Sequence, residues 1–306
     1  MKSILGIGNA ITDVYISLPD NSLLERYSIT PGSIAHVSRE EAQSLLEGAE
    51  EAGYNVERVP GGSAANTVSL GAQMGLKCGF IGKLGMDRLG DGYLRSLELH
   101  GVDCSVSRGG KGSGVAIVLV TASVERTLVV SPGAALELVP DELDPETFTA
   151  YDHLHLEGFV MECPGVAARA MQLAKEMGLT VSFDIGSQRI ARKHNAQLKQ
   201  LIGEYVDIVF ATYDEATAYA GPAHEDIAPV TVVKCGPEGS VIYSGGDTIK
   251  IKAYPAQVVD TFGAGDAYAA AFLNSFFNGL TLAECGEAGS RIAAEIIGKK
   301  GARLFL

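Results

Sequence analysis

The chain has 306 residues, 46% of them apolar and 20% charged, so it can bury a large core as one big α/β domain or as a domain with an appendage. This composition excludes a disordered chain. The net charge of −13 argues against a surface for nucleic acid or for an anionic membrane, so any phosphate must be bound locally by amides, a metal ion and a few cations.

The cysteines and the first residues indicate the cellular compartment. Five cysteines are scattered along the chain and form no C-x-x-C pair, which fits free thiols in a reducing cytosol better than disulfides or a zinc site. The first residues lead into a strand-like run without a signal-peptide pattern, and no apolar run approaches membrane-spanning length. The sequence therefore predicts a cytoplasmic protein with no membrane partner.

The first strand is expected at residues 4–8, an apolar run that ends in glycine. Residues 6–11 resemble the start of a dinucleotide fingerprint, but Ile11 stands where the third glycine belongs, so we reject a dehydrogenase site. Asp13 follows a few residues after the strand end, where open α/β sheets place their ligands. By itself, Asp13 could equally be a turn residue.

Residues 40–51 are expected to form an acidic helix, and Gly61-Gly62 opens a helix of small residues that reaches Met74. Two glycines followed by Asn66 suit a backbone that lies against a polar ligand. Taken alone, Ser63 is more simply an N-cap.

The next segments are expected to form a separate small sheet. Strands are predicted at 115–120 and 127–130, on either side of a turn at 123–125, and they lie between helical units. We therefore expect a β lid built from roughly 14–37 and 103–131. An exposed apolar face on this lid could pair with a second copy of the chain.

From residue 153 onward strands and helices alternate, which predicts a mainly parallel sheet covered by helices. His153 and His155 would share one strand face, but no third ligand stands at a suitable spacing, so core or surface histidines are favoured over a metal pair. Strands at 230–235 and 240–243 bracket Gly236 and Gly239, as in an ordinary hairpin.

The motif at 260–266, Asp-Thr-Phe-Gly-Ala-Gly-Asp, runs straight into a predicted helix at 267–277. Its glycines allow a tight turn, and the amides of residues 263–266 would point out of a helix N-terminus and attract an anion. A carboxylate at Asp266 would repel that anion, unless it is a base that takes a proton from a hydroxyl attacking a phosphoryl group. The simpler alternative is an Asp-capped helix after a glycine turn.

Taken together, the 260–266 motif, Gly61-Gly62 with Asn66, and Asp13 resemble the ribokinase (PfkB) family of carbohydrate and nucleoside kinases over essentially the whole chain. Residues 8–13 and the ending at 293–303 look most like the adenosine-kinase-like branch. The resemblance implies an α/β, ribokinase-like fold in one kinase domain over 1–306, with a mainly parallel central sheet covered by helices on both faces and a small β lid.

The resemblance also implies residue roles. Asp266 is the expected base, and the amides of the anion hole are those of Gly263, Ala264 and Gly265. The acceptor substrate is expected at Asn9, Asp13, Gly61, Gly62 and Asn66. ATP is expected at Thr212, Lys234, Gly236, Gly239 and Thr261. Mg²⁺ should bridge the phosphates near Glu215, and Asp260 would lie by a monovalent-cation (K⁺) site.

The sequence departs from the family pattern at one position. Relatives carry Asn-x-x-Glu near the metal and phosphates, whereas this chain has Thr212 in place of the Asn and retains Glu215. The expected activity is ATP-dependent phosphorylation of a primary hydroxyl on an adenosine-like nucleoside or a sugar. Phe159 and the strand at 115–120 are candidates for a slot that takes a base. The alternative is a catalytically impaired nucleotide- or sugar-binding protein of the same fold.

Overall fold

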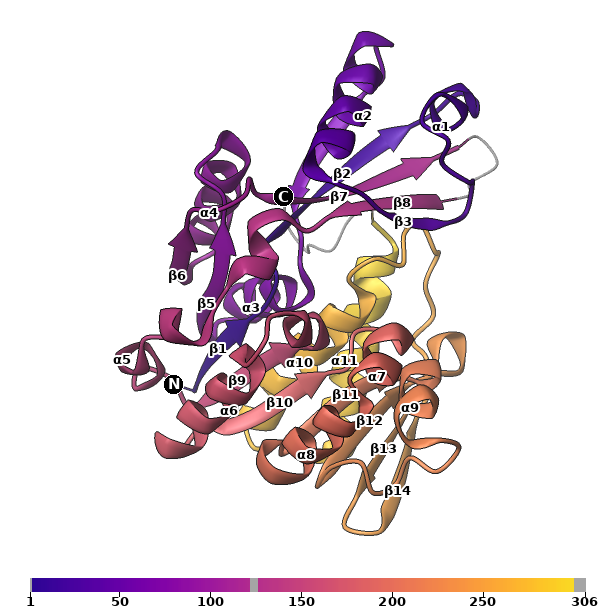
Figure 1. The fold of residues 1–306 in the computed structure, drawn as a ribbon. Helices are drawn as coiled ribbons and strands as arrows, with labels where there is room; N and C mark the ends of the chain where they lie inside the picture. Colours follow the sequence, from indigo (N-terminus) through magenta and orange to yellow (C-terminus); the bar gives the residue numbers. More distant parts are fainter. Residues whose placement is uncertain (1, 122–125, 300–306) are drawn as a thin grey trace.

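The computed structural model describes residues 2–121 and 126–299, within which the strands form two sheets (Figure 1). The large sheet is parallel except at one edge, where β13 and β14 run antiparallel to their neighbours. Its strands, in spatial order, are β14 (Asp247–Ile251), β13 (Ser240–Ser244), β12 (Val230–Lys234), β11 (Ile208–Thr212), β10 (Thr180–Asp184), β9 (His153–Glu157), β1 (Ser3–Ile7), β5 (Lys77–Leu84) and β6 (Val102–Arg108).

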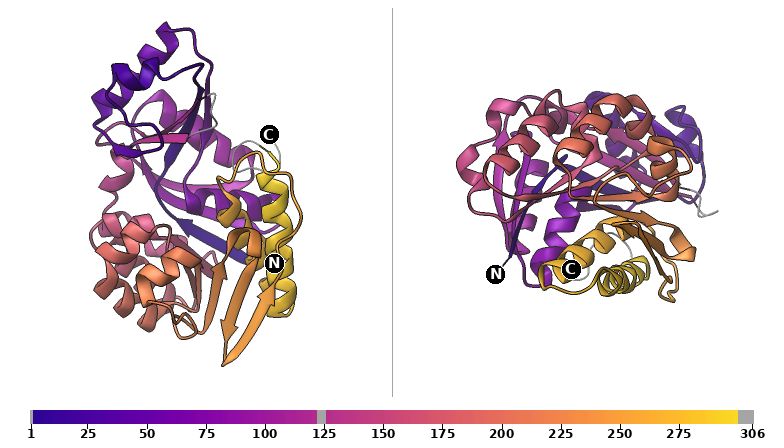
Figure 2. Two further views of the ribbon diagram at one scale, coloured as in Figure 1. Left: turned by 90° about the vertical axis from the view of Figure 1, so that its right-hand side faces the viewer. Right: turned by 90° about the horizontal axis from the view of Figure 1, so that it is seen from below.

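Helices cover both faces of the large sheet (Figure 2, right). One face packs against α3 (Ser63–Gln73), α4 (Arg88–Leu99), α10 (Ala264–Phe277) and α11 (Leu282–Ile297). The other packs against α5 (Pro145–Phe148), α6 (Val166–Glu176), α7 (Gln188–Lys193), α8 (Asn195–Tyr205) and α9 (Tyr213–Ala220). Short 3₁₀ turns lie in the connections, at η1 (Gly133–Glu137), η2 (Pro140–Glu142), η3 (Gly158–Glu162) and η4 (Gly236–Glu238).

The two strand histidines belong to the core, as favoured from the sequence. His153 and His155 are fully buried, and their rings share the Ser182 hydroxyl at 2.7 and 2.8 Å. His153 also contacts the Thr180 hydroxyl at 2.7 Å. Burial lowers the pKa of both rings, that of His155 to about 4, so both are neutral at physiological pH.

The second, small sheet stands beside the carboxyl ends of the large sheet's parallel strands (Figure 1). Its strands, in spatial order, are β3 (Ile34–His36), β8 (Arg126–Ser131), β7 (Gly114–Val120), β2 (Ile11–Ser17) and β4 (Val56–Pro60). The helices α1 (Ser22–Arg26) and α2 (Arg39–Glu51) cover one of its faces. Val14, Ile16 and Ile117 face these helices, because alternate residues of a strand point to opposite sides.

The bounds expected for the lid need correction. Residues 102–108 form β6 of the large sheet, where they pair in parallel with β5 from Val102 opposite Cys78 to Arg108 opposite Leu84. Residues 56–60, which the sequence did not assign to the lid, pair with β2. The predicted turn at 123–125 and the family-like ending at 301–303 lie outside the described residues.

The five cysteines, Cys78, Cys104, Cys163, Cys235 and Cys285, are free thiols, as expected. In the described part of the chain, no helix is both long and apolar enough to cross a membrane.

Candidate active site

The site begins at the N-terminus of α10. Gly263 is the N-cap, with φ +75°, a left-handed conformation that glycine adopts readily. The helix starts at Ala264, so the first-turn amides at residues 264–266 have no acceptor within the helix and can bind an anion. The two Asp266 oxygens accept hydrogen bonds from α3 and not from the amides of their own helix, so Asp266 does not cap α10.

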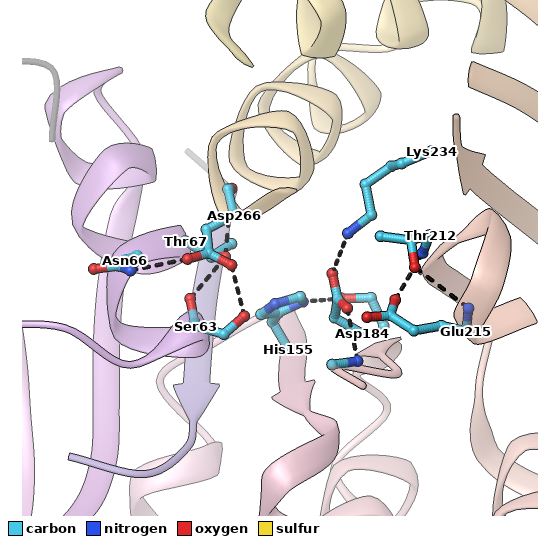
Figure 3. A network of polar contacts seen from close by, with 11 residues as sticks. Ser63, Asn66, Thr67, His155, Asp184, Thr212, Glu215, Lys234 and Asp266 are labelled. Atoms are coloured by element: carbon cyan, nitrogen blue, oxygen red, sulfur yellow. Dashed lines mark hydrogen bonds and ion pairs between the residues drawn. The ribbon is translucent and has the colours of Figure 1, made fainter. Parts of the chain in front are cut away.

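Asp266 instead faces α3 (Figure 3). Its Oδ1 accepts a hydrogen bond from the Ser63 hydroxyl at 2.7 Å, and its Oδ2 accepts one from the Asn66 amide at 2.8 Å. Burial raises the pKa of Asp266 above its ordinary value of 3.8, and the two hydrogen bonds oppose that rise. The carboxylate is therefore oriented by two donors, on a residue that is half-buried as a whole.

Two α3 residues direct side-chain groups to Asp266. Ser63 is not the N-cap: Gly62 occupies that position with φ +91°, and the Ser63 hydroxyl is directed to Asp266 instead. Asn66 was expected to hold the acceptor, yet its amide nitrogen donates to Asp266. Its Oδ1 is buried without a hydrogen-bond partner among the described residues.

The loop at Gly61-Gly62 brings β2 against α3. The Gly61 amide donates to the Ile11 carbonyl at 2.8 Å. A Cβ on Gly61 would overlap the Asp13 carboxylate, and one on Gly62 would overlap the Asn9 carbonyl oxygen. The structure thus brings Asn9, Asp13 and the two glycines together beside the Asp266 cluster, as the sequence predicted.

A residue that sequence reasoning missed holds this region together. Glu157 lies at the end of β9, only 1% exposed, and its two oxygens accept the amides of Asn9 and Ala64, each at 2.8 Å. Burial raises the pKa of Glu157 to about 7, against the lowering effect of those amide bonds. The only local signal was an acidic residue ending an apolar strand.

We expect Glu157→Gln to destabilise the protein by about 1–3 kcal/mol, because the new NH₂ group cannot accept and one buried amide loses its partner. The raised pKa means that the folded protein binds more protons than the unfolded chain between pH 4.5 and about 7. The stability that the wild-type carboxyl contributes is therefore lost as the pH rises through that range. Urea unfolding should therefore show that Glu157→Gln lowers the free energy of unfolding more at pH 5.8 than at pH 8.

Glu176→Gln, on the exposed end of α6, makes the same chemical change away from any buried amide and serves as the control. Equal, pH-independent effects of the two variants would show that Glu157 does not hold the Asn9 and Ala64 amides.

A second polar cluster lies at the ends of β10 and β12 (Figure 3). The Lys234 ammonium pairs with Asp184 at 2.7 Å, and Asp184 also accepts the Gly186 amide at 3.1 Å. Burial alone would lower the pKa of Lys234, but the carboxylates of Asp184, Glu215 and Asp266 raise it overall. Lys234 was expected here, whereas Asp184 was missed.

Thr212 and Glu215 form a capping box at the start of α9. The Glu215 carboxylate accepts the Thr212 amide at 2.7 Å, and the Thr212 hydroxyl accepts the Glu215 amide at 3.3 Å. Burial and then Asp184 raise the pKa of Glu215, while Lys234 lowers it. The threonine that replaces the family asparagine is therefore engaged with its own helix.

No cluster of three or more His, Cys, Asp or Glu side chains among the described residues could hold a metal ion alone. Asp184 and Glu215 nevertheless place two carboxylates near Lys234, whose ammonium lies against Gly265 of the anion-binding turn. In phosphoryl-transfer sites, Mg²⁺ binds to one or two carboxylates and completes its ligand set with phosphates and water. The residues therefore fit a Mg²⁺ ion that arrives with ATP.

Asp260 faces an arginine of the small sheet. It is 3% exposed, and its Oδ1 accepts from Arg126 at 2.9 Å and from the Phe262 amide at 3.0 Å. The guanidinium also lies 5.4 Å from the centre of the Phe262 ring. The carboxylate expected beside a monovalent cation thus already has a cationic partner, which ties β8 to the turn before α10.

The remaining nucleotide candidates border the same edge of the sheet. Thr261 is exposed, and its carbonyl accepts the Ala264 amide at 3.3 Å. Gly236 and Gly239 flank a tight turn between β12 and β13, confirming the hairpin. The turn begins two residues after Lys234.

Residues 32–306 match the family described as pfkB family carbohydrate kinase. A protein of Archaeoglobus fulgidus named as an uncharacterized sugar kinase is 32% identical over 241 residues, which cover 76% of this chain and 96% of that protein. A nucleoside kinase of Methanothermobacter thermautotrophicus is 30% identical over 250 residues, covering 79% of each chain. The crystal structure of adenosine kinase from Sinorhizobium meliloti is 28% identical and superposes with a TM-score of 0.86, covering 99% of this chain and 95% of that one.

Proposed function

Since the chain belongs to the pfkB family of carbohydrate kinases, we propose that it transfers the terminal phosphoryl group of ATP to a primary hydroxyl of a nucleoside. The observation that carries the proposal is the carboxylate of Asp266, held by Ser63 and Asn66 in the first turn of a helix whose N-terminal amides suit an anion. A base and an anion site are thus side by side.

In this reaction Asp266 accepts the proton of the attacking hydroxyl as the new oxygen–phosphorus bond forms and the bond to ADP breaks. The amides of Gly263, Ala264 and Gly265 hold the oxygens of the transferred phosphoryl group. Bound Mg²⁺ would neutralise phosphate charge, with Asp184 and Glu215 as its protein ligands. The raised pKa of Asp266 brings the base closer to neutral pH, where a general base is most effective.

The acceptor is proposed to lie along the Gly61-Gly62 loop. The buried Oδ1 of Asn66 has no partner among the described residues, and a sugar hydroxyl would satisfy it. Asp13 and the backbone around Asn9 supply further hydrogen-bonding groups at the same loop. These groups suit a ribose or similar sugar with several hydroxyls.

The face of the small sheet opposite α1 and α2 favours a nucleoside over a free sugar. Asp13 and Tyr15 identify this face as the one toward the site, because Asp13 contacts Gly61 and the Tyr15 ring lies 6.5 Å from that of Phe262. Strand pairing puts four apolar side chains on it, those of Ala116, Val118, Leu128 and Val130. Ala116 and Val118 are buried, whereas Leu128 and Val130 are half-buried and supply the accessible apolar area of this face. Such an area beside a hydroxyl-binding loop suits a flat aromatic base.

Within the strand at 115–120, only alternate residues can therefore contact a bound base. Ala116 and Val118 share the face of Asp13, while Val115, Ile117 and Leu119 pack under the helices. Phe159 packs against Gly186, whose amide donates to Asp184.

A turnover screen tests the proposal. The purified protein with ATP and Mg²⁺, with and without K⁺, is offered nucleosides and, separately, pentoses and hexoses, and ADP release is measured. We expect the highest kcat/KM with a purine nucleoside and a product phosphorylated on its primary hydroxyl. Turnover with free sugars alone would exclude the nucleoside. Calorimetric binding of a nucleoside or sugar without ATP consumption across the panel would establish the impaired binding protein instead.

A further inference from the structure

Lys234 lies among three carboxylates from three different elements (Figure 3). Asp184 ends β10, Glu215 is in the first turn of α9, and Asp266 is in the first turn of α10. The Lys234 side chain is 13% exposed and that of Asp184 6% exposed, so their 2.7 Å ion pair is largely removed from water.

The ammonium also lies against the anion-binding turn. A Cβ built on Gly265 would come within 2.9 Å of Lys234 Nζ. Gly265 therefore leaves room for the ammonium beside the very amides that would hold the phosphoryl group. An ammonium has three N–H donors, and Asp184 takes only one of them in the described contacts.

Neutralising Asp184 does not by itself explain this arrangement. A buried ion pair contributes little net stability compared with a well-packed apolar pair, because both charges lose their water. Three carboxylates, those of Asp184, Glu215 and Asp266, act electrostatically on this one ammonium, although only Asp184 contacts it, so the region carries more negative than positive charge. A phosphoryl group entering here would meet these carboxylates, and the Lys234 ammonium beside the anion-binding turn would oppose their repulsion together with bound Mg²⁺.

We propose that Lys234 is a catalytic residue whose ammonium donates to an oxygen of the phosphoryl group during transfer, and that Asp184 is the positioning residue that aims it. The proposal rests on the kinase function proposed above. Lys234 keeps its proton throughout, and the proton of the acceptor hydroxyl goes to Asp266. The ammonium acts by opposing charge that builds on the phosphoryl oxygens.

The first test separates a contact to phosphate from mere neutralisation of Asp184. Lys234→Met should lower kcat by about 10²-fold, the typical effect of removing one donor to a transition state, with KM for the acceptor changed less than about three-fold. The double variant Asp184→Asn/Lys234→Met removes both charges and is compared with Asp184→Asn alone, because Asp184 is also a proposed Mg²⁺ ligand whose loss slows both variants. We expect the double variant to be at least ten-fold slower than Asp184→Asn. A double variant with a kcat within about three-fold of that of Asp184→Asn would show that Lys234 only neutralises Asp184 and would overturn the proposal.

The double variant also guards against misfolding, because it leaves no unpaired buried carboxylate at Asp184. Lys175→Met removes the ammonium of a half-exposed ion pair with Asp207 and is the matched control. Its kcat should equal that of the wild type.

A binding measurement tests Lys234 without turnover. Calorimetry compares Mg²⁺ complexes of ADP and of a non-hydrolysable ATP analogue that carries the third phosphate. Lys234→Met should raise the Kd for the analogue at least ten-fold and the Kd for ADP less than three-fold. An equal loss of affinity for both nucleotides would show that the Lys234 ammonium does not contact the transferred phosphoryl group. If the wild-type protein binds the analogue but phosphorylates no acceptor, the proposed kinase function is refuted. The comparison of analogue and ADP binding would still test the contact between Lys234 and the third phosphate.

Discussion

Asp266→Asn is expected to lower kcat by about 10²–10⁴-fold, the usual contribution of a general base, while the Kd for ATP stays within a few-fold. The amide keeps the shape of the carboxylate but cannot accept the hydroxyl proton. One of its two atoms must also present N–H groups to Ser63 or Asn66, both of which donate to the carboxylate. Steady-state kinetics with the best acceptor and calorimetry with ATP·Mg²⁺ measure the two effects.

The pH dependence of the same reaction identifies the base. Burial raises the pKa of Asp266 above 3.8, so the acid limb of the wild-type kcat/KM profile should lie above the pH at which a free aspartate titrates. The residual activity of Asp266→Asn should lack that limb. Asp247→Asn, an exposed residue at the start of β14, should match the wild type in both rate and profile. A kcat within three-fold of wild type for Asp266→Asn would mean that another group removes the proton.

The parts of the site that were predictable from sequence depend on local chemistry. Gly263 must adopt a left-handed conformation before a helix, and a motif with glycines at 263 and 265 ahead of an apolar run indicates that geometry directly. The alternation of strands and helices after residue 153 likewise indicates a parallel sheet. The expected ribokinase-like α/β fold is confirmed by the structural match to an adenosine kinase.

The missed residues depend on which strands are neighbours. Glu157 binds the amides of Asn9 and Ala64 only because β9 pairs with β1. The first residue pair of these two strands, Ile4 and His153, is separated by 149 residues in the sequence. Asp184 meets Lys234 because β10 and β12 end at the same edge, on either side of β11. Nothing in the local sequence around either acid encodes that register.

Two predictions were wrong for the same reason, namely the N-cap role of Ser63 and the assignment of residues 103–108 to the lid: both depend on tertiary contacts. A serine after two glycines satisfies the local rule for an N-cap, and only the packing of α10 against α3 supplies the Asp266 carboxylate that takes its hydroxyl instead. The strand at 102–108 has no local feature that distinguishes an edge strand of the large sheet from a strand of the small one. Its pairing with β5 decides the matter.

Tertiary contacts also link the small sheet to the catalytic turn. Arg126, the first residue of β8, pairs with Asp260 and lies over Phe262, while Tyr15 of β2 contacts the same ring. Two side-chain contacts of the turn that precedes the anion site therefore come from the sheet that would cover the acceptor. A shift of this sheet would be transmitted to the turn through the ion pair and the two ring contacts.

Gly62→Ala is expected to lower the free energy of unfolding by about 3 kcal/mol and kcat/KM for the acceptor at least ten-fold. At φ +91° and ψ 128° an alanine is strained by roughly 1–3 kcal/mol, and its Cβ would overlap the Asn9 carbonyl oxygen, a backbone atom that cannot rotate away. The loop must then move, and it carries Asn9 and the start of α3 with it. Urea unfolding and acceptor kinetics measure the two effects.

Gly53→Ala is the matched control for this change. Gly53 has φ +76°, also a left-handed value, but a Cβ there would meet nothing within 4 Å. It should therefore show only the conformational penalty, about 1 kcal/mol, with unchanged kinetics. The difference between the two variants isolates the contact with Asn9. If both lose the same stability and neither loses activity, the close approach of this loop to the Asn9 carbonyl does not shape the acceptor site.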